Sequence, residues 1–398
     1  MSPSPNPDVR DRPAHPYPVQ IHSLTSIRYV AAAWVVLFHF QALVNSAALL
    51  SLPLVRLGYL GVDFFFILSG FVLAHVYRPK VISGKFDYWD FLTKRIGRIY
   101  PMHIFMLSLF IIFGLVSASL NLNLKLWDPA AAFTLLERGQ LIRNLTAQFS
   151  LIPAWGATSG LFFNLPSWSI SAEWFAYLLF PVFTLIVAAI RPRGIWPVAI
   201  LSAIFVGLGA ATSLIIGNEL TAMSWNIGIF RIAPEFMLGI ALYAFGETWT
   251  AGRWAGAAAL SSAALVFLMI MVGGPLFDYH WLIKLVVVLG LGAIILFAAD
   301  AERQVGPGLL AHRSLVLLGE ISYSVYMVHM GVGVILFEVI APDFTPPGPW
   351  TAAMAVLAGL GVVTALSYLT YRLVEIPGRR MITTAARRLY RGAPATAG

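Results

Sequence analysis

The chain has 398 residues, of which 59% are hydrophobic and 11% are charged, whereas soluble globular domains carry about 45–50% apolar and about 25% charged residues. This composition excludes a soluble domain and indicates an all-α integral membrane protein. The net charge of +8 does not indicate a nucleic-acid partner, because the charges sit at the ends of apolar segments. The lack of cysteine excludes disulfides, thiolate metal sites and a cysteine-linked acyl-enzyme.

Ten apolar segments are long enough to cross a hydrocarbon core ~30 Å thick, which takes about 20 residues. Residues 1–20 lack the apolar core of a signal peptide and are predicted to be a disordered cytoplasmic tail. A membrane domain should cover 21–378, with a long outer loop at 119–169 that holds an amphipathic segment, and a basic cytoplasmic tail 379–398. The predicted spans are 24–46, 58–78, 99–118, 170–190, 196–216, 226–246, 254–272, 281–299, 321–340 and 351–372.

The positive residues give the orientation of these spans. When both termini are placed in the cytoplasm, 19 of the 26 Lys and Arg residues lie in cytoplasmic segments, four lie outside and three lie within spans. Positive residues accumulate on the cytoplasmic side, so the distribution supports ten crossings with both ends inside.

The first span, "SIRYVAAAWVVLFHF", contains Arg28 and His39. Eleven residues correspond to ~1100° of rotation and ~16 Å of rise, so the two side chains share one helix face at different depths. Ionisable groups inside a membrane are costly and usually functional. The alternative is a snorkelling arginine and a histidine bonded to a neighbouring helix.

The second span, "GVDFFFILSGF", places Asp63 near its outer end and Ser69 near its middle. Because a short loop makes the first two spans neighbours, Asp63 could orient the His39 imidazole as in an acid/base pair. Alternatively, Asp63 interacts only with its own helix dipole. Gly70 is interpreted as a site of close helix packing, because the G-x-S-x-G pattern of a nucleophile elbow is absent.

The third span opens with "KRIGRIYPMH", in which Arg95 and Arg98 are i,i+3 neighbours. Forked guanidinium groups suit phosphates, so these residues indicate a polyanion site. The alternative is an ordinary positive-inside anchor. No glycine-rich phosphate loop is present.

Two later spans bring further polar residues to the outer half of the membrane. "SWSISAEWFAYLLFP" holds Trp168 and Glu173, and "RIAPEFMLG" places Arg231 and Glu235 at i,i+4, where they could pair. These groups are expected at the depth of the His39–Asp63 pair, although they could be purely structural ion pairs. His103, Lys284 and His329 are left without a role, and no close helical histidine pair indicates a metal.

The chain resembles the acyltransferase 3 family of multi-pass membrane acyltransferases. An arginine followed after ten residues by a histidine, in "RYVAAAWVVLFH", is similar to that family's first helix. The resemblance extends in family order over about residues 22–376, through "GVDFFFILSGFVL", "KRIGRIYPMH", "SWSISAEWFAYLLFP", "RIAPEFMLG" and "GEISYSVYMVH".

The resemblance implies transfer of an acyl group, commonly acetyl, from cytoplasmic acyl-CoA to a sugar hydroxyl at the outer face of a bacterial inner membrane. The expected partners are acyl-CoA, a glycan or lipid-linked saccharide such as exopolysaccharide or lipopolysaccharide, and membrane lipids, with no permanently bound cofactor. Some family members carry an additional SGNH-type domain, which is not expected here.

Combined with this resemblance, the polar residues receive hypothetical roles. His39 would be the general base, with Asp63 as its partner. Donor binding is assigned to Arg28, Arg95, Arg98 and Ser69, and acceptor binding to Trp168, Glu173, Arg231 and Glu235. Two other classes remain open: a proton-coupled secondary transporter, in which the buried acids and His39 form a relay, and a scaffold for glycan assembly. The absence of an internal repeat counts against a transporter.

Overall fold

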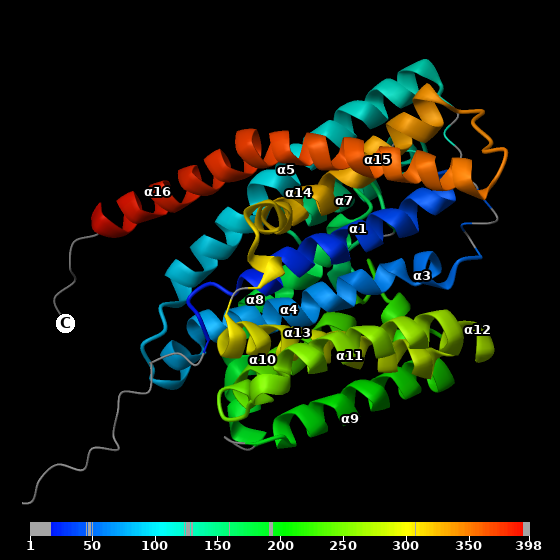
Figure 1. Ribbon diagram of the computed structural model, residues 1–398. Coiled ribbons are helices and arrows are strands. Elements are labelled where there is room, and N and C mark those ends of the chain that lie inside the picture. Colours follow the sequence, from blue (N-terminus) through cyan, green and yellow to red (C-terminus); the bar gives the residue numbers. More distant parts are fainter. Residues whose placement is uncertain are drawn as a thin grey trace, which may run out of the picture.

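The computed structural model describes residues 17–44, 46, 49, 51–122, 124, 128, 130–158, 160–190, 194–306 and 308–392. Residues 1–16 of the predicted N-terminal tail and 393–398 of the C-terminal tail lie outside this described part. All secondary-structure elements in it are helices (Figure 1).

Ten helical segments of the described chain are long and apolar enough to cross a membrane, as predicted. Short helices lie between them: α3 (Pro53–Arg56), α6 (Ala131–Thr134) and α7 (Arg138–Phe149). The ten are α1 (His22–Val44); α4 (Gly61–Ile82) after η1 (Gly58–Leu60); α5 (Tyr88–Leu120); α8 (Ser167–Ile190); α9 (Trp196–Ala211) with η3 (Thr212–Ile216); α10 (Gly228–Gly246); α11 (Ala255–Leu268) with η6 (Met269–Gly273) and α12 (Gly274–Leu276); α13 (Trp281–Val305); α14 (Arg313–Val334) with η8 (Ile335–Ile340); and α15 (Pro349–Thr370) with η9 (Tyr371–Glu375) and α16 (Ile376–Gly392).

Two of these helices extend furthest beyond the predicted spans. α5 begins at Tyr88, where the Asp87 side chain caps the helix by accepting a hydrogen bond of 2.9 Å from the Asp90 N–H. Its 33 residues correspond to roughly 50 Å, more than a bilayer core requires. The last span continues past residue 372 as η9 and α16, so residues 379–392 of the predicted basic tail are helical. Hydropathy detects only the part of a helix that lies in hydrocarbon.

Glycines bring the central helices into close contact. A Cβ atom added to Gly70 of α4 would lie 2.0 Å from the Phe236 carbonyl oxygen of α10, and one added to Gly239 would lie 2.0 Å from the Ile67 carbonyl oxygen. Between α1 and α14, a Cβ on Gly319 would lie 1.8 Å from the Thr25 carbonyl oxygen. The interpretation of Gly70 as a helix-packing residue is therefore confirmed.

The helices form layers around this centre. In Figure 1, α1, α4, α8 and α14 lie in the middle, α5, α15 and α16 cover one side, and α9 and α11 cover the opposite side. The outer helices expose large apolar side chains, such as Leu260, Phe267 and Leu357, as expected for surfaces in contact with lipid.

The loop predicted at 119–169 contributes α7, in agreement with the predicted helical segment. Gln140 accepts a hydrogen bond of 3.2 Å from the Glu137 N–H at its start, and the side chain of His103 in α5 donates from Nε2 to the Gln148 carbonyl oxygen at 2.8 Å. His103 therefore fastens α7 to the bundle. Lys284 pairs with Glu219 at 2.5 Å, which gives this residue a structural role as well.

Candidate active site

A wide polar cavity of about 610 Å³ opens between α1, α5, α14 and the α15–α16 helix. Its lining carries six cationic side chains and one carboxylate, that of Glu320. We call it the basic cavity. Its lining residues are Gln20, Thr25, Arg28, Tyr77, Lys94, Arg95, Arg98, Glu320, Tyr371, Arg379, Thr383 and Arg387.

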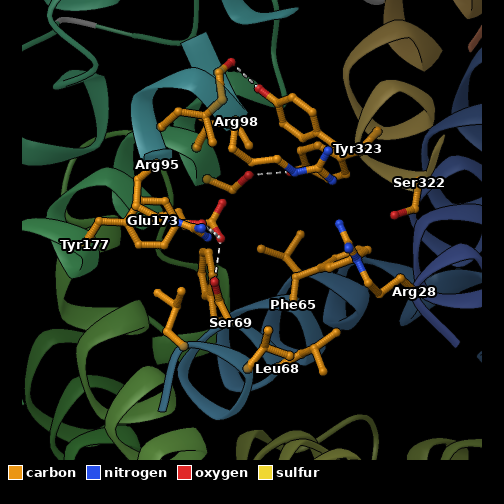
Figure 2. Close-up of a pocket in the computed structure, with 18 residues that line it drawn as sticks. Arg28, Phe65, Leu68, Ser69, Arg95, Arg98, Glu173, Tyr177, Ser322 and Tyr323 are labelled. Atoms are coloured by element: carbon orange, nitrogen blue, oxygen red, sulfur yellow. Dashed lines mark hydrogen bonds between the residues drawn. The ribbon is translucent and has the colours of Figure 1, made fainter. Parts of the chain in front are cut away.

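A second cavity of about 140 Å³ adjoins it and extends among α1, α4, α5, α8 and α14. We call it the inner cavity. The two cavities share Arg28, Arg95 and Arg98, so the three arginines predicted to bind the donor come together. Figure 2 shows Arg28 on one side of the inner cavity, with Arg95 and Glu173 on the other. Ser69, also assigned to the donor, lines the same space.

Arg98 is held in place by Glu375 of η9, a residue without a role in the sequence-based interpretation. The Arg98 Nη1 group donates to Glu375 Oε1, and the hydroxyl of Ser324 donates to Glu375 Oε2 at 2.9 Å. The guanidinium also lies 5.4 Å from the centre of the Tyr323 ring. The only sequence signal for Glu375 was a single acid beyond an apolar span, in "YRLVEIPGRR".

Glu173 lies in the inner cavity, and the prediction that it joins an outer cluster with Arg231 and Glu235 is wrong. Its Oε1 atom accepts hydrogen bonds of 2.6 Å from the hydroxyls of Ser69 and Tyr177. The segment before α8 is itself buried inside the protein, with Asn164 donating to the Met327 carbonyl oxygen at 3.0 Å. α8 therefore begins inside the protein, and Glu173 reaches the depth of Ser69.

Asp63 pairs with Arg231. The prediction that it pairs with His39 is wrong. Arg231 Nε and Nη2 donate to the two oxygens of Asp63 at 3.0 and 2.5 Å, and both side chains are buried. The glycine-mediated crossing of α4 and α10 brings these residues together. A forked guanidinium neutralises a buried carboxylate, which a neutral imidazole cannot do.

The predicted Arg231–Glu235 ion pair is also not formed. Glu235 is fully buried beside the Asp63–Arg231 pair, where its side chain interacts with that of Asp63 and forms no ion pair with Arg231. The Trp168 ring centre lies 5.3 Å from the Arg231 guanidinium carbon. Trp168, Arg231 and Glu235 thus lie together, separate from the donor arginines.

His39 lies against a second histidine, His329 of α14. The sequence alone gives no role for His329. His329 Nε2 is 3.1 Å from His39 Nδ1, His39 Nδ1 is 3.0 Å from the Val35 carbonyl oxygen, and His329 Nδ1 is 2.6 Å from the Tyr326 carbonyl oxygen. Because a carbonyl oxygen only accepts, His329 Nδ1 carries a hydrogen and its Nε2 has a lone pair.

These contacts determine the tautomer of His39. Its Nδ1 faces two acceptors, the Val35 carbonyl oxygen and His329 Nε2, and therefore carries the hydrogen. In the neutral imidazole, Nε2 of His39 then has the free lone pair. His39 is only half buried, and this nitrogen makes no hydrogen bond with another described residue. His39 is thus prepared to accept a proton at Nε2.

Two aromatic side chains lie between the inner cavity and the histidine pair. Tyr326 lines the cavity, and its ring centre is 5.8 Å from that of His329 and 6.3 Å from that of Phe65. The Tyr326 hydroxyl is 2.7 Å from the hydroxyl of Ser169. His39 is not a lining residue of the inner cavity, so this wall separates the donor arginines from the imidazole.

Comparisons with known proteins identify the family of the chain. A family described as an acyltransferase domain matches residues 21–372. Acyltransferase MdmB of Streptomyces mycarofaciens is 30% identical over 392 residues, which cover 92% of this chain and 94% of that relative. Exopolysaccharide production protein ExoZ of Rhizobium meliloti is 25% identical over 329 residues, or 81% of this chain and 89% of that relative.

A shorter similarity links the chain to O-acetyltransferase OatA of Staphylococcus aureus, at 26% identity over 208 residues, 51% of this chain and 31% of that relative. No solved structure matches the chain. The family match spans both histidines and the arginines of the inner cavity. The chain belongs to the acyltransferase 3 family, and it is a multi-pass membrane acyltransferase.

Proposed function

We propose that this protein transfers an acyl group, acetyl in the simplest case, from acyl-CoA to a saccharide hydroxyl. The observation that carries the proposal is the pair of adjoining cavities lined by arginines. The inner one reaches Tyr326, whose ring lies against His329 of the histidine pair, in which Nε2 of His39 has the free lone pair. The relatives named an O-acetyltransferase and an exopolysaccharide production protein support an O-linked saccharide acceptor.

The donor would lie along α1. Its phosphates would contact Arg28, Arg95 and Arg98, because guanidinium forks bind phosphate oxygens with charge-assisted hydrogen bonds. The pantetheine arm would then follow the apolar lining of the inner cavity, past Phe65 and Tyr326, toward His39. Arg28 and His39 are separated by ~16 Å of helix rise, a distance on the order of an extended pantetheine arm.

The chemistry requires one proton transfer in each direction. His39 Nε2 accepts the hydroxyl proton while the hydroxyl oxygen attacks the thioester carbonyl carbon. The carbon–sulfur bond then breaks, and the proton passes from His39 to the departing thiolate. His329 Nε2 and the Val35 carbonyl oxygen hold the Nδ1–H of His39 throughout and stabilise its protonated form.

We further propose that the basic cavity faces the cytoplasm and that the acceptor approaches from the opposite side of a bacterial inner membrane. Most Lys and Arg residues lie in the segments on the side of the basic cavity, and positive residues accumulate on the cytoplasmic side of a membrane, which supports this orientation. Trp168 and Glu235, which lie beside the Asp63–Arg231 pair, are on the acceptor side in this arrangement. Glu173 belongs with the donor.

The test is release of free CoA by the purified protein in the presence of acyl-CoA and an oligosaccharide acceptor. His39→Ala should lower turnover by ~10²–10⁴-fold, the usual contribution of a positioned general base. His280→Asn serves as the control, because His280 is an exposed helix N-cap outside both cavities. Turnover of the His39→Ala protein at the control rate, or release of CoA without any acylated acceptor, would contradict the proposal.

A further inference from the structure

The C-terminal helix α16 lies beyond the residues matched by the family, which end at 372. It packs along the N-terminal half of α5 (Figure 1). A Cβ on Gly378 would lie 2.4 Å from the Pro101 Cβ atom, and one on Gly97 would lie 3.5 Å from the Thr383 methyl group. Gly378 thus allows the close approach of the two helices, which places α16 beside the basic cavity.

One face of α16 lines that cavity. Arg379, Thr383 and Arg387 follow each other at intervals of four residues, so they lie on the same side of the helix, and all three are lining residues. Arg380 and Arg388 are their immediate neighbours in sequence and do not line the cavity. The helix therefore presents two of these four arginines to the cavity and turns the other two away.

The cations of the basic cavity outnumber their acidic partners. Arg98 is paired with Glu375, and Lys94 with Asp90 at 2.5 Å. The remaining four, Arg28, Arg95, Arg379 and Arg387, form no ion pair with a carboxylate of the described chain.

The Nε atom of Arg95 is buried and has no hydrogen-bond partner among the described residues. Cations gathered in this way repel one another, and a bound polyanion would relieve the repulsion.

We propose that Arg379 and Arg387 form a second phosphate subsite, at which α16 holds the phosphorylated nucleotide end of the acyl-CoA donor. This inference rests on the proposed function for the identity of the donor. Arg28, Arg95 and Arg98 lie where the inner cavity begins and would bind the phosphates next to the pantetheine arm. Arg379 and Arg387 line only the outer, basic cavity, and they would bind the phosphate farthest from the thioester.

The test compares two double variants of identical charge change, Arg379→Gln/Arg387→Gln and Arg380→Gln/Arg388→Gln. CoA binding is measured by calorimetry with the full-length protein in an uncharged detergent, and turnover is measured with acetyl-CoA, with 3′-dephospho-acetyl-CoA and with acetyl-pantetheine, which has no nucleotide. The first variant should bind CoA at least tenfold more weakly, since charge-assisted hydrogen bonds are lost. It should use acetyl-pantetheine as well as the wild type does. The second variant should match the wild type throughout.

Equal CoA affinity of the two double variants would overturn the subsite while leaving the proposed function intact. The same loss with acetyl-pantetheine as with acetyl-CoA would also overturn it, because the effect would not concern the nucleotide. If the α16 arginines instead bind anionic lipid headgroups, the first variant will bind CoA normally in detergent and differ from the wild type only in nanodiscs containing phosphatidylglycerol. Failure of the wild type to bind CoA would overturn both proposals.

Discussion

Two groups of arginines lie inside this membrane domain, and they differ in their partners. Arg231 is buried and forms a bidentate ion pair with Asp63, whereas Arg28 and Arg95 line the inner cavity and pair with no carboxylate of the described chain. Both groups had appeared equally suited to function, because charges in a membrane are costly. A buried charge that has an ion-pair partner stabilises the helix packing, whereas a charge without such a partner beside a cavity indicates a bound ligand.

The largest effect on stability is expected from Arg231→Met. This substitution leaves the buried Asp63 carboxylate without its counter-ion, and breaking a buried pair costs about 3–5 kcal/mol. Asp63→Asn should cost less, because Glu235 then remains as a second carboxylate beside Arg231. Thermal unfolding in detergent measures both. If both variants lose only a little thermal stability, and by the same amount, Arg231 does not stabilise the helix packing.

A smaller effect, confined to catalysis, is expected at His329. His329→Leu removes one of the two acceptors of the His39 Nδ1–H and leaves only the Val35 carbonyl oxygen, so it should lower kcat by about 10²-fold with little change in KM for acyl-CoA. His329→Gln, whose amide oxygen can take the position of Nε2, should restore part of kcat. If both variants lose activity only in proportion to their thermal stability, His329 has no role in positioning His39.

The smallest of the three effects is expected from Arg95→Gln. Loss of one charge-assisted contact should raise KM for acyl-CoA about tenfold and leave thermal stability unchanged. Arg253→Gln is the control, because Arg253 is exposed and lies outside both cavities. Raising the salt concentration should weaken donor binding in the wild type more than in Arg95→Gln. A large loss of stability on replacing Arg95 would place it with Arg231 as a structural charge.

The sequence predicted the ten spans, the packing role of Gly70 and the gathering of three donor arginines with Ser69. Hydropathy determines the spans, whereas the common donor site of the arginines and Ser69 was implied by the resemblance to the family. The depth of Glu173 could not be predicted, because it depends on a buried loop that lets α8 begin inside the protein. The pairing of Asp63 with Arg231, in place of the predicted pairs with His39 and Glu235, depends on the glycine-mediated crossing of α4 and α10.

The contribution of α16 was missed for a different reason. An amphipathic basic helix has no continuous apolar run, so its sequence is typical of a tail. The His39–His329 contact joins residues 290 positions apart, and only tertiary packing brings them together.

The most direct test of the proposed donor path, from the arginines to His39, is a structure of the protein with a nonhydrolysable acyl-CoA bound. We expect the pyrophosphate to contact Arg28 and Arg95, the arm to pass between Phe65 and Tyr326, and the acyl carbonyl to reach Nε2 of His39. A donor whose acyl end stays on the arginine side of Phe65, or whose nucleotide lies outside the basic cavity, would contradict this path.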